Sequence, residues 1–477
     1  MRAAAGMPLS ASEISAARQS FDSPAIAADA TAYPAMPRRP QRPLSTPQLL
    51  RVALSSTLAA FDEELFDAPI VERRFVWGRF FMVSDPDGIR RVMQDNVDNY
   101  PRIDVLHRVF AFTAGTGMLA AEGEVWRRHR RLLNPALDHR TVLADLPVFV
   151  ELSEALAGHL ARLPAGEDID IGQTFAHLIT AMTGRVFAAG DRDIDPVLYR
   201  LGQYPGKYRL RDFLGFTDGR RDRHNEIAEF LPLIDRLIAA RREPDYAGPR
   251  DLLWRIANAR DREADAGLDD AEIRDEVLTL GATAATPLRV FAWLWYLLAS
   301  HPGVEARLHT ELDRVLGGRP PIAEDLPRLV YLRQIVDETL RLYPPAPTML
   351  RSAIADDVVC GRKIPKRAIV GVFPWVVHRH RRLWHDPDRF DPGRFAPDQI
   401  AARSRYAYLP FAIGPHVCIG ASLALVEIIV AVAVLAQRFR FRLVPGRAIE
   451  PIAWTNLHPK GGIRMTVEPR EAVPHAG

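Results

Sequence analysis

Residues 409–427, LPFAIGPHVCIGASLALVE, constrain this chain more than any other stretch. In them a loop containing Gly414 leads directly into an apolar helix, and Cys418 stands at the junction. The free N–H groups and positive end of a helix lower the pKa of a cysteine and hold its sulfur as an anion. Gly414 permits a turn closed to other residues, and Gly420 lets the helix lie close against a partner. The stretch therefore predicts a thiolate at a helix start, beside a flat object.

The residues around Cys418 narrow the nature of that object. A lone Cys-x-Gly favours a buried core cysteine, which is what most single cysteines are. Here Phe411, Gly414 and His416 complete a longer pattern, in which His416 offers a donor or a positive charge to an anion. A flat, anionic, iron-bearing group satisfies these features, so we predict haem with Cys418 as axial ligand. The whole pattern, Phe-x-x-Gly-x-His-x-Cys-x-Gly, closely resembles the haem-binding loop of the cytochrome P-450 family.

The length of the chain then has to be reconciled with that resemblance. The 477 residues are 48% hydrophobic, enough to bury a large core, and length alone suggests about three domains. The resemblance instead implies one mainly α unit with a small β-rich lobe, a triangular helical prism. We therefore expect a disordered or tethering segment at 1–45, a single domain at 46–470 and a tail at 471–477.

Charge and cysteine content bound the compartment and the partners. The net charge is only +3, and the two cysteines are too few and too far apart for a disulfide framework. Residues 1–45 lack the apolar run of a signal peptide or membrane anchor, which favours a soluble, cytoplasmic protein. Residues 419–435 are apolar enough to resemble a membrane span, but Glu427 interrupts them and they are predicted to form a core helix.

A second informative segment is 123–137, GEVWRRHRRLLNPAL, which is predicted to be a helix. Trp126 and Arg130 fall one helical turn apart and share a face. The resemblance implies that this pair, together with Arg351 further along, binds the haem propionates. The remaining basic residues, 127–129 and 131, are expected to form a basic surface, either a solvated face or a docking patch. The run is short and lacks interleaved aromatic residues, so nucleic acid is a poor explanation for it.

Residues 269–300 are predicted to form one long helix. The resemblance implies that this helix crosses the distal face of the haem, with an Ala-Gly-x-acid-Thr-Thr signature. Thr286 is retained at the catalytic threonine position, whereas Ala285 stands where the acid belongs and Pro287 introduces a kink. Thr286 could alternatively bond the carbonyl four residues back. Without the acid, water, the substrate or Arg289 would have to organise proton delivery.

A third pattern joins two distant segments. Glu338 and Arg341 lie one turn apart on a helix predicted at 324–343, where such a pair is usually a minor surface feature. Downstream, Arg394 stands in a Pro-x-Arg-Phe sequence. The resemblance implies that the three residues form a buried network that locks the loop behind the cysteine.

The remaining segments carry less chemistry. We expect a hairpin at 73–83, a capped helix from 84 to about 94, a long loop at 100–118, a lid at 203–223, and strands at 358–372 and 439–468. Cys360 lacks the glycine frame and the helix start, so it is predicted to be inert. The resemblance implies the following substrate-contact candidates: Ala282, Ala285, Pro347, Leu350 and Leu457.

The resemblance implies haem b (iron protoporphyrin IX) as cofactor and insertion of one oxygen atom from dioxygen into a small, fairly apolar substrate. Cys418 would donate electron density to the iron, and Thr286 would assist oxygen activation. A ferredoxin or flavodoxin with its reductase would supply electrons. Two alternatives remain: a haem-thiolate enzyme driven by peroxide, nitric oxide or substrate rearrangement, and a non-catalytic haem- or ligand-binding protein.

Overall fold

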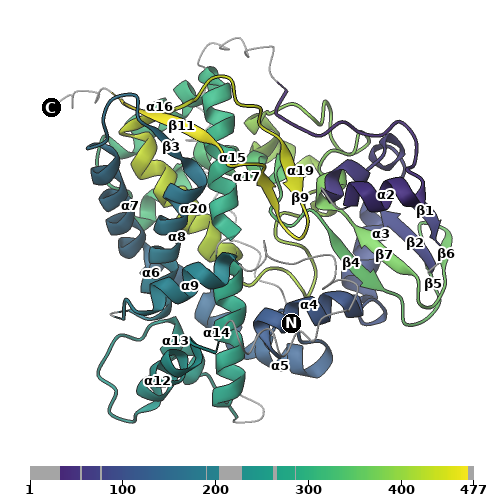
Figure 1. Ribbon diagram of the computed structural model, residues 1–477, viewed down its shortest axis with the longest axis horizontal. Coiled ribbons are helices and arrows are strands. Elements are labelled where there is room, and N and C mark those ends of the chain that lie inside the picture. The colour runs from purple at the N-terminus through teal and green to yellow at the C-terminus, as the bar shows by residue number, and fades with distance from the viewer. Residues whose placement is uncertain are drawn as a thin grey trace.

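The computed structural model describes residues 33–53, 56–75, 78–189, 191–203, 228–261, 266–284 and 286–470. Helices make up the body of the molecule, and a small four-stranded sheet lies at one edge (Figure 1). The architecture is mainly α with a small β-rich lobe, which confirms the predicted fold class.

Twelve α-helices form the body of the described part of the chain. They are α5 (Gly123–Leu133), α6 (His139–Ala144), α7 (Leu146–Leu160), α8 (Ile171–Phe187), α9 (Ile194–Gln203), α12 (Leu231–Arg242), α13 (Leu252–Ala257), α14 (Asp270–Ala284), α15 (Thr286–Ser300), α16 (Pro302–Leu316), α17 (Val330–Leu342) and α20 (Ala421–Ala436). The other α-helices of the described residues are α2 (Thr46–Ala53), α3 (Pro86–Arg90), α4 (Asp104–Ala114), α18 (Pro374–Val377) and α19 (Pro397–Ala402).

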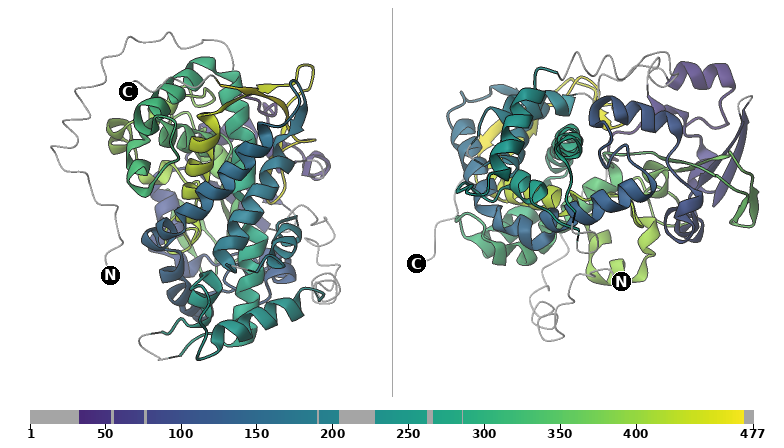
Figure 2. Two further views of the ribbon diagram at one scale, coloured as in Figure 1. Left: turned by 90° about the vertical axis from the view of Figure 1, so that its left-hand side faces the viewer. Right: turned by 90° about the horizontal axis from the view of Figure 1, so that it is seen from below.

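Helices α15 and α20 form the centre of the core. Helix α15 packs against α8, α16, α17 and α20, and α20 also packs against α7. Every residue of α20 from Val426 onward is buried, so it is a core helix as expected. The span Asp270–Ser300 is long and apolar enough to cross a membrane, but 65% of its most apolar window is buried inside the protein. In the view from below, other helices surround this span (Figure 2).

Four sheets hold the strands together. The main sheet has the order β1-β2-β7-β4, in which β1 (Ile70–Phe75) and β2 (Gly78–Val83) form the predicted hairpin. Strand β2 pairs in parallel with β7 (Ile369–Val372), and β7 pairs antiparallel with β4 (Met349–Ser352). The other sheets join β3 (Asp168–Asp170), β11 (Arg464–Pro469) and β8 (Phe439–Leu443), then β9 (Pro451–Ala453) with β10 (Leu457–Pro459), then β5 (Asp357–Val359) with β6 (Arg362–Ile364).

Two sequence predictions about secondary structure are wrong. Residues 100–118 are not one long loop, because Asp104–Ala114 forms α4, which packs against α14. Flanking Pro and Gly residues concealed the apolar spacing of this short helix. The helix predicted at 324–343 is also divided into a 3-10 helix, Ala323–Arg328, followed by α17. Pro327 lacks the N–H that a continuous α-helix would need at that point.

The long helix predicted at 269–300 is described as two helices, α14 and α15, with Pro287 in the first turn of the second. Residue 285, where the two meet, lies outside the described residues, as does the predicted lid beyond Gln203. Helix α3 begins as predicted, with the Asp85 side chain accepting hydrogen bonds from the N–H groups of Asp87 and Gly88.

The described part of the predicted N-terminal tether lies against the body of the protein. The Ala35 N–H donates to the Tyr296 hydroxyl at 2.9 Å, and the Tyr343 hydroxyl donates to the Ala35 carbonyl at 2.8 Å. Arg39 forms an ion pair with Asp388 at 2.5 Å. Ala35 thus fastens this segment to α15 and to the residue that follows α17.

Candidate functional site

Cys418 lies immediately before α20, where its N–H donates to the carbonyl of Phe411 at 2.8 Å. The side chain is exposed, yet protein atoms surround it closely enough that burial raises the pKa of the thiol. A side chain that lines an internal space can be accessible on one side and still be enclosed by protein atoms, which accounts for both observations. The predicted lowering of the pKa is wrong for the protein alone, because burial outweighs the Gly420 N–H and the Arg130 charge. A thiolate here requires a bound cation, which a coordinated metal supplies.

The two glycines around Cys418 have different roles. Gly414 adopts φ +76°, and a Cβ atom added to it would lie 2.0 Å from the Met93 carbonyl oxygen, so this position requires glycine. A Cβ atom added to Gly420 would meet no protein atom closer than the Cys418 sulfur at 4.0 Å. The open side of Gly420 therefore faces the thiol, where a flat group can approach the start of α20.

Two arginines near the cysteine loop have no carboxylate partner within the described residues. Arg130 donates to the Val417 carbonyl at 2.8 Å, and burial lowers the pKa of its guanidinium. Arg351, on β4, is only 6% exposed and donates to the Leu350 carbonyl at 3.1 Å. Burial and the Arg102 charge lower the pKa of Arg351 to about 10, against the opposing charge of Glu122. Enclosed cations that form no ion pair with a carboxylate indicate a missing anion.

His416 and Trp126 lie beside these arginines. Their rings are in contact, with centroids 4.0 Å apart and planes tilted by 33°, and Trp126 is buried. Burial, together with the charges of Arg102, Arg351 and Arg130, lowers the pKa of His416 to about 4. The imidazole is therefore neutral in the protein alone, and it can offer an N–H to an anion without adding a charge.

Arg102 and Glu122 belong to the same cluster and escaped the sequence analysis. Glu122 lies 2.6 Å from Arg102 and 3.9 Å from His416. Arg102 also donates to the carbonyls of Leu119 and Ala121 and forms a β-bridge with Arg351. Neither residue stands in a recognisable local motif. The only sequence signal was that Glu122 is an acidic residue directly before α5.

These residues fit a haem. Haem presents one iron to an enclosed thiol and two anionic propionates to enclosed cations, which matches Cys418 with Arg130 and Arg351. In the described part of the chain no three His, Cys, Asp or Glu side chains converge to hold a metal directly. Iron carried by a macrocycle, with one protein sulfur as ligand, is therefore the arrangement that the side chains support.

Behind the cysteine loop, Glu338 and Arg341 form a fully buried ion pair with N–O distances of 2.5 and 2.7 Å. Arg394 lies 3.5 Å from Glu338 and donates to the carbonyls of His385 and Asp386. Arg341 also donates to the carbonyls of three residues, His378, Pro387 and Arg389. The structure thus brings together all three residues that the sequence analysis grouped.

His378 links this network to the cysteine loop and was not anticipated. Its Nε2 accepts a hydrogen bond from the Leu409 N–H at 2.7 Å, so its Nδ1 donates to the Arg341 carbonyl at 3.0 Å. Burial lowers the pKa of His378 well below its usual value, which keeps the ring neutral for this double role. The sequence carried no signal for it, because its partners are distant backbone groups.

The helix residues predicted to lie on the distal side differ in their surroundings. The Thr283 hydroxyl donates to the Thr279 carbonyl at 3.1 Å, whereas Thr286 is partly exposed and makes no such bond to the described residues. Ala285 lies outside the described residues. Among the substrate-contact candidates, Ala282, Pro347 and Leu457 are buried and Leu350 is partly exposed.

Of the basic residues expected on the surface of α5, Arg127 and Arg131 are exposed, which agrees with a solvated face, whereas His129 is not on the surface. The three arginines form ion pairs. Arg127 pairs with Asp98, Arg128 with Glu272 and Arg131 with Asp261. His129 is fully buried, 2.6 Å from Glu276 on α14. Burial opposes the charge of His129, but the hydrogen bond and charges of Glu276 and Glu272 raise its pKa. These residues fasten α5 to the rest of the protein.

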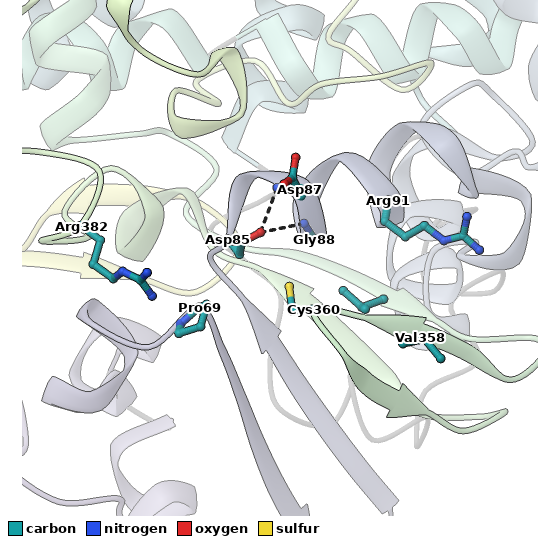
Figure 3. Close-up of a pocket in the computed structure, with 9 residues that line it drawn as sticks. Pro69, Asp85, Asp87, Gly88, Arg91, Val358, Cys360 and Arg382 are labelled. Atoms are coloured by element: carbon teal, nitrogen blue, oxygen red, sulfur yellow. Dashed lines mark hydrogen bonds between the residues drawn. The ribbon is translucent and has the colours of Figure 1, made fainter.

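Cys360 has different surroundings from Cys418. It borders a cavity of about 430 Å³ at the edge of the β lobe, beside Asp85, Asp87, Gly88, Arg91 and Arg382 (Figure 3). Burial and the Asp85 carboxylate raise the pKa of the Cys360 thiol to about 11. A thiol that stays protonated agrees with the prediction that Cys360 is inert.

Comparisons with known proteins agree with this geometry. Residues 48–195 and 207–467 match the family described as Cytochrome P450. The crystal structure of the cytochrome P450DA heme domain superposes with a TM-score of 0.74 over 85% of this chain and 90% of its own, at 24% identity.

Three curated relatives are similar over most of their length. Cyclooctatin synthase of Streptomyces melanosporofaciens is 34% identical over 75% of this chain and 79% of its own. Cyclooctat-9-en-7-ol 5-monooxygenase of the same organism is 33% identical over 84% and 88%. Protein LUTEIN DEFICIENT 5 of Arabidopsis thaliana is 29% identical over 87% and 76%. The chain therefore belongs to the cytochrome P450 family.

Proposed function

We propose that this protein is a haem-thiolate monooxygenase that inserts one atom of dioxygen into a small organic substrate, the other atom leaving as water. The observation that carries the proposal is the enclosed Cys418 thiol beside Arg130 and Arg351, two cations without carboxylate partners in the described residues. A non-catalytic binding protein would not need a thiolate ligand, which favours O–O cleavage.

Each residue of the site has a definite task in this proposal. Haem, when bound, supplies the iron at which dioxygen is activated. Cys418 would bind that iron through its sulfur, and Arg130 and Arg351 would pair with the two propionates. His416 would donate its N–H to a propionate, and the ring contact with Trp126 would hold the imidazole in place. The Thr286 hydroxyl, which has no partner in the described residues, holds a proton-donating group on the distal side.

The substrate and the partners follow from the same site and from the relatives. The name of one relative, cyclooctat-9-en-7-ol 5-monooxygenase, gives an alkenol as its substrate. We infer a largely apolar substrate for this protein as well. A ferredoxin or flavodoxin with its reductase would deliver electrons in the cytoplasm.

Ala285 supports a second candidate function. The residue before Thr286 carries no acid, so the usual proton relay is incomplete. A haem-thiolate enzyme that uses peroxide, nitric oxide or substrate rearrangement does not need this relay.

Product formed per NAD(P)H consumed separates the two functions. In a dioxygen-driven enzyme, Thr286→Ala should lower this ratio and release more hydrogen peroxide, because the best-placed hydroxyl is lost. Ala285→Asp should also change the ratio, upward if the relay is merely incomplete and downward if the new charge is stranded. If neither substitution changes the ratio, and added peroxide supports the reaction as well as electrons do, the second function holds. Thr283→Val, which removes a hydroxyl already bonded to the helix backbone, is the matched control.

A further inference from the structure

A second unpaired cation lies on the distal side of the protein. Arg289 follows Thr286 by three residues on α15, so the two side chains occupy neighbouring positions on one helix face. Within the described residues Arg289 has no hydrogen bond or ion pair. Its side chain is partly exposed, yet burial lowers the pKa of its guanidinium. Like the Cys418 thiol, it therefore borders an internal space.

His458 forms the other half of this cluster. It lies on β10, which packs against α15, and its Nδ1 lies 3.2 Å from the Asn456 carbonyl. Burial and the nearby Arg289 charge lower the pKa of His458. The imidazole is therefore neutral at pH 7, and with Nδ1–H donated to Asn456 its Nε2 is left as an acceptor. The cluster carries one net positive charge, from Arg289.

The haem does not account for this charge. The cations assigned to the propionates act on one another, since Arg351 and Arg130 both lower the pKa of His416. Arg289 lies on α15, whereas the residues assigned to the propionates lie on α5, on β4 and in the cysteine loop. The cluster of Arg289 and His458 is therefore built on other elements than the propionate cluster. An enclosed guanidinium near Thr286 therefore calls for an anion other than a propionate.

We propose that Arg289 recognises the substrate, and that the substrate is an apolar molecule carrying one carboxylate, with its hydrocarbon part directed toward Thr286. One guanidinium beside a neutral imidazole balances one negative charge, which favours a carboxylate over a dianionic phosphate. The planar guanidinium also matches a carboxylate with two parallel hydrogen bonds. This inference rests on the proposed monooxygenase function and adds the substrate class.

Binding measurements with matched acids and esters test the proposal. The probes are 1-adamantanecarboxylic acid and dodecanoic acid, each compared with its methyl ester, followed by the haem absorption shift and by calorimetry. The wild-type protein should bind at least one acid about ten- to a hundredfold more tightly than its ester, because a charged hydrogen bond is lost in the ester. Arg289→Met should abolish the preference, and Arg289→Lys should retain part of it. Arg314→Met, at an exposed position on α16, removes the same charge and should keep the preference.

A melting temperature completes the test. Without ligand, Arg289→Met should melt at or above the wild-type temperature, since it removes an enclosed charge that lacks a partner. A clear drop would reveal a partner within the chain itself and would overturn the proposal. Equal wild-type affinity for acid and ester, or no binding of either acid, would overturn it as well. Failure of the monooxygenase function would instead appear as loss of the thiolate-type carbon monoxide spectrum in the wild-type protein.

Discussion

Three enclosed ionisable groups around the cysteine helix lack an oppositely charged partner in the described residues: Arg130, Arg351 and Glu427. The two arginines border the space beside Cys418, where haem propionates would pair with them. Glu427 lies instead in the core, and one of its carboxylate oxygens has no hydrogen-bond partner. An enclosed ionisable group without a charged partner thus indicates a bound ligand at Arg130 and Arg351, and a protonated acid at Glu427.

Replacing Arg351 should not destabilise the haem-free protein but should weaken haem retention in the haem-loaded protein. In haem-free protein, Arg351→Met should leave the melting temperature unchanged or raise it, because a buried unpaired charge is removed. In haem-loaded protein, the same substitution should weaken haem retention about tenfold or more, because one propionate loses a charged hydrogen bond. Haem transfer to apomyoglobin and thermal melts measure the two effects. Arg362→Met, at an exposed position on β6, should change neither, and equal loss of stability in both states would contradict the assignment.

Glu427 should make stability depend on pH. Burial raises its pKa from 4.5 to about 8, so the folded protein holds the proton more tightly than the unfolded chain. The free energy of unfolding should be unaffected below about pH 4.5, then fall by about 1.4 kcal/mol per pH unit up to about pH 8. Urea denaturation at pH 5, 6, 7 and 8 measures this slope. Glu427→Gln should remove that part of the slope and the exposed Glu167→Gln should not; identical slopes in both would contradict the buried acid.

Single residues differ in how readily the sequence reveals them. The positions around Cys418 could be predicted because a thiolate, a tight turn and a close helix approach each require a particular residue type at a short spacing. Arg102, Glu122 and His378 could not, because their partners lie far away in sequence or are backbone carbonyls. The lowered thiol pKa was predicted from the helix start alone, and burial reversed it.

At the scale of elements, α17 is joined to the cysteine loop by one buried network. Glu338 accepts hydrogen bonds from Arg341 and from the Asp391 N–H, and Arg341 reaches three backbone carbonyls beyond it. His378 continues the connection to Leu409, at the start of the cysteine loop. The position of Cys418 therefore depends on charges that lie outside its own loop.

Removing one charge from this network should prevent haem loading. Glu338→Ala leaves Arg341 buried and unpaired, a defect that costs about 3–5 kcal/mol. We expect little soluble, haem-loaded protein, as measured by soluble yield and by haem per polypeptide. Glu324→Ala, on the exposed 3-10 helix before α17, should load normally. Normal loading of Glu338→Ala would show that the network does not hold the loop.

Secondary structure was predictable where periodicity and caps were strong. The hairpin of β1 and β2 and the Asp85 cap of α3 match their sequence signals. Helix α4 was missed because its face is only partly buried, so its pattern is weak beside the flanking Pro and Gly residues. The ion pairs of α5 and the burial of His129 were not predictable, because the acidic partners lie on other elements, Glu272 on α14 among them.

For the whole molecule, the fold encloses two spots of positive charge that are built on different elements. One spot, around Arg130 and Arg351, lies beside Cys418, and the other, around Arg289 and His458, lies between α15 and β10. Helices enclose both spots, and Arg351 and His458 come from strands β4 and β10. This arrangement supports the proposed division into a haem-binding region and a substrate-binding region.

The central claim is that Cys418 is the axial thiolate ligand of haem. The absorption spectrum of the reduced protein with carbon monoxide tests it most directly, because thiolate ligation gives the red-shifted band for which the family is named. Wild-type protein and Cys360→Ser should show this band, and Cys418→His should lose it while still binding haem. A band that survives in Cys418→His, or that disappears in Cys360→Ser, would contradict the account.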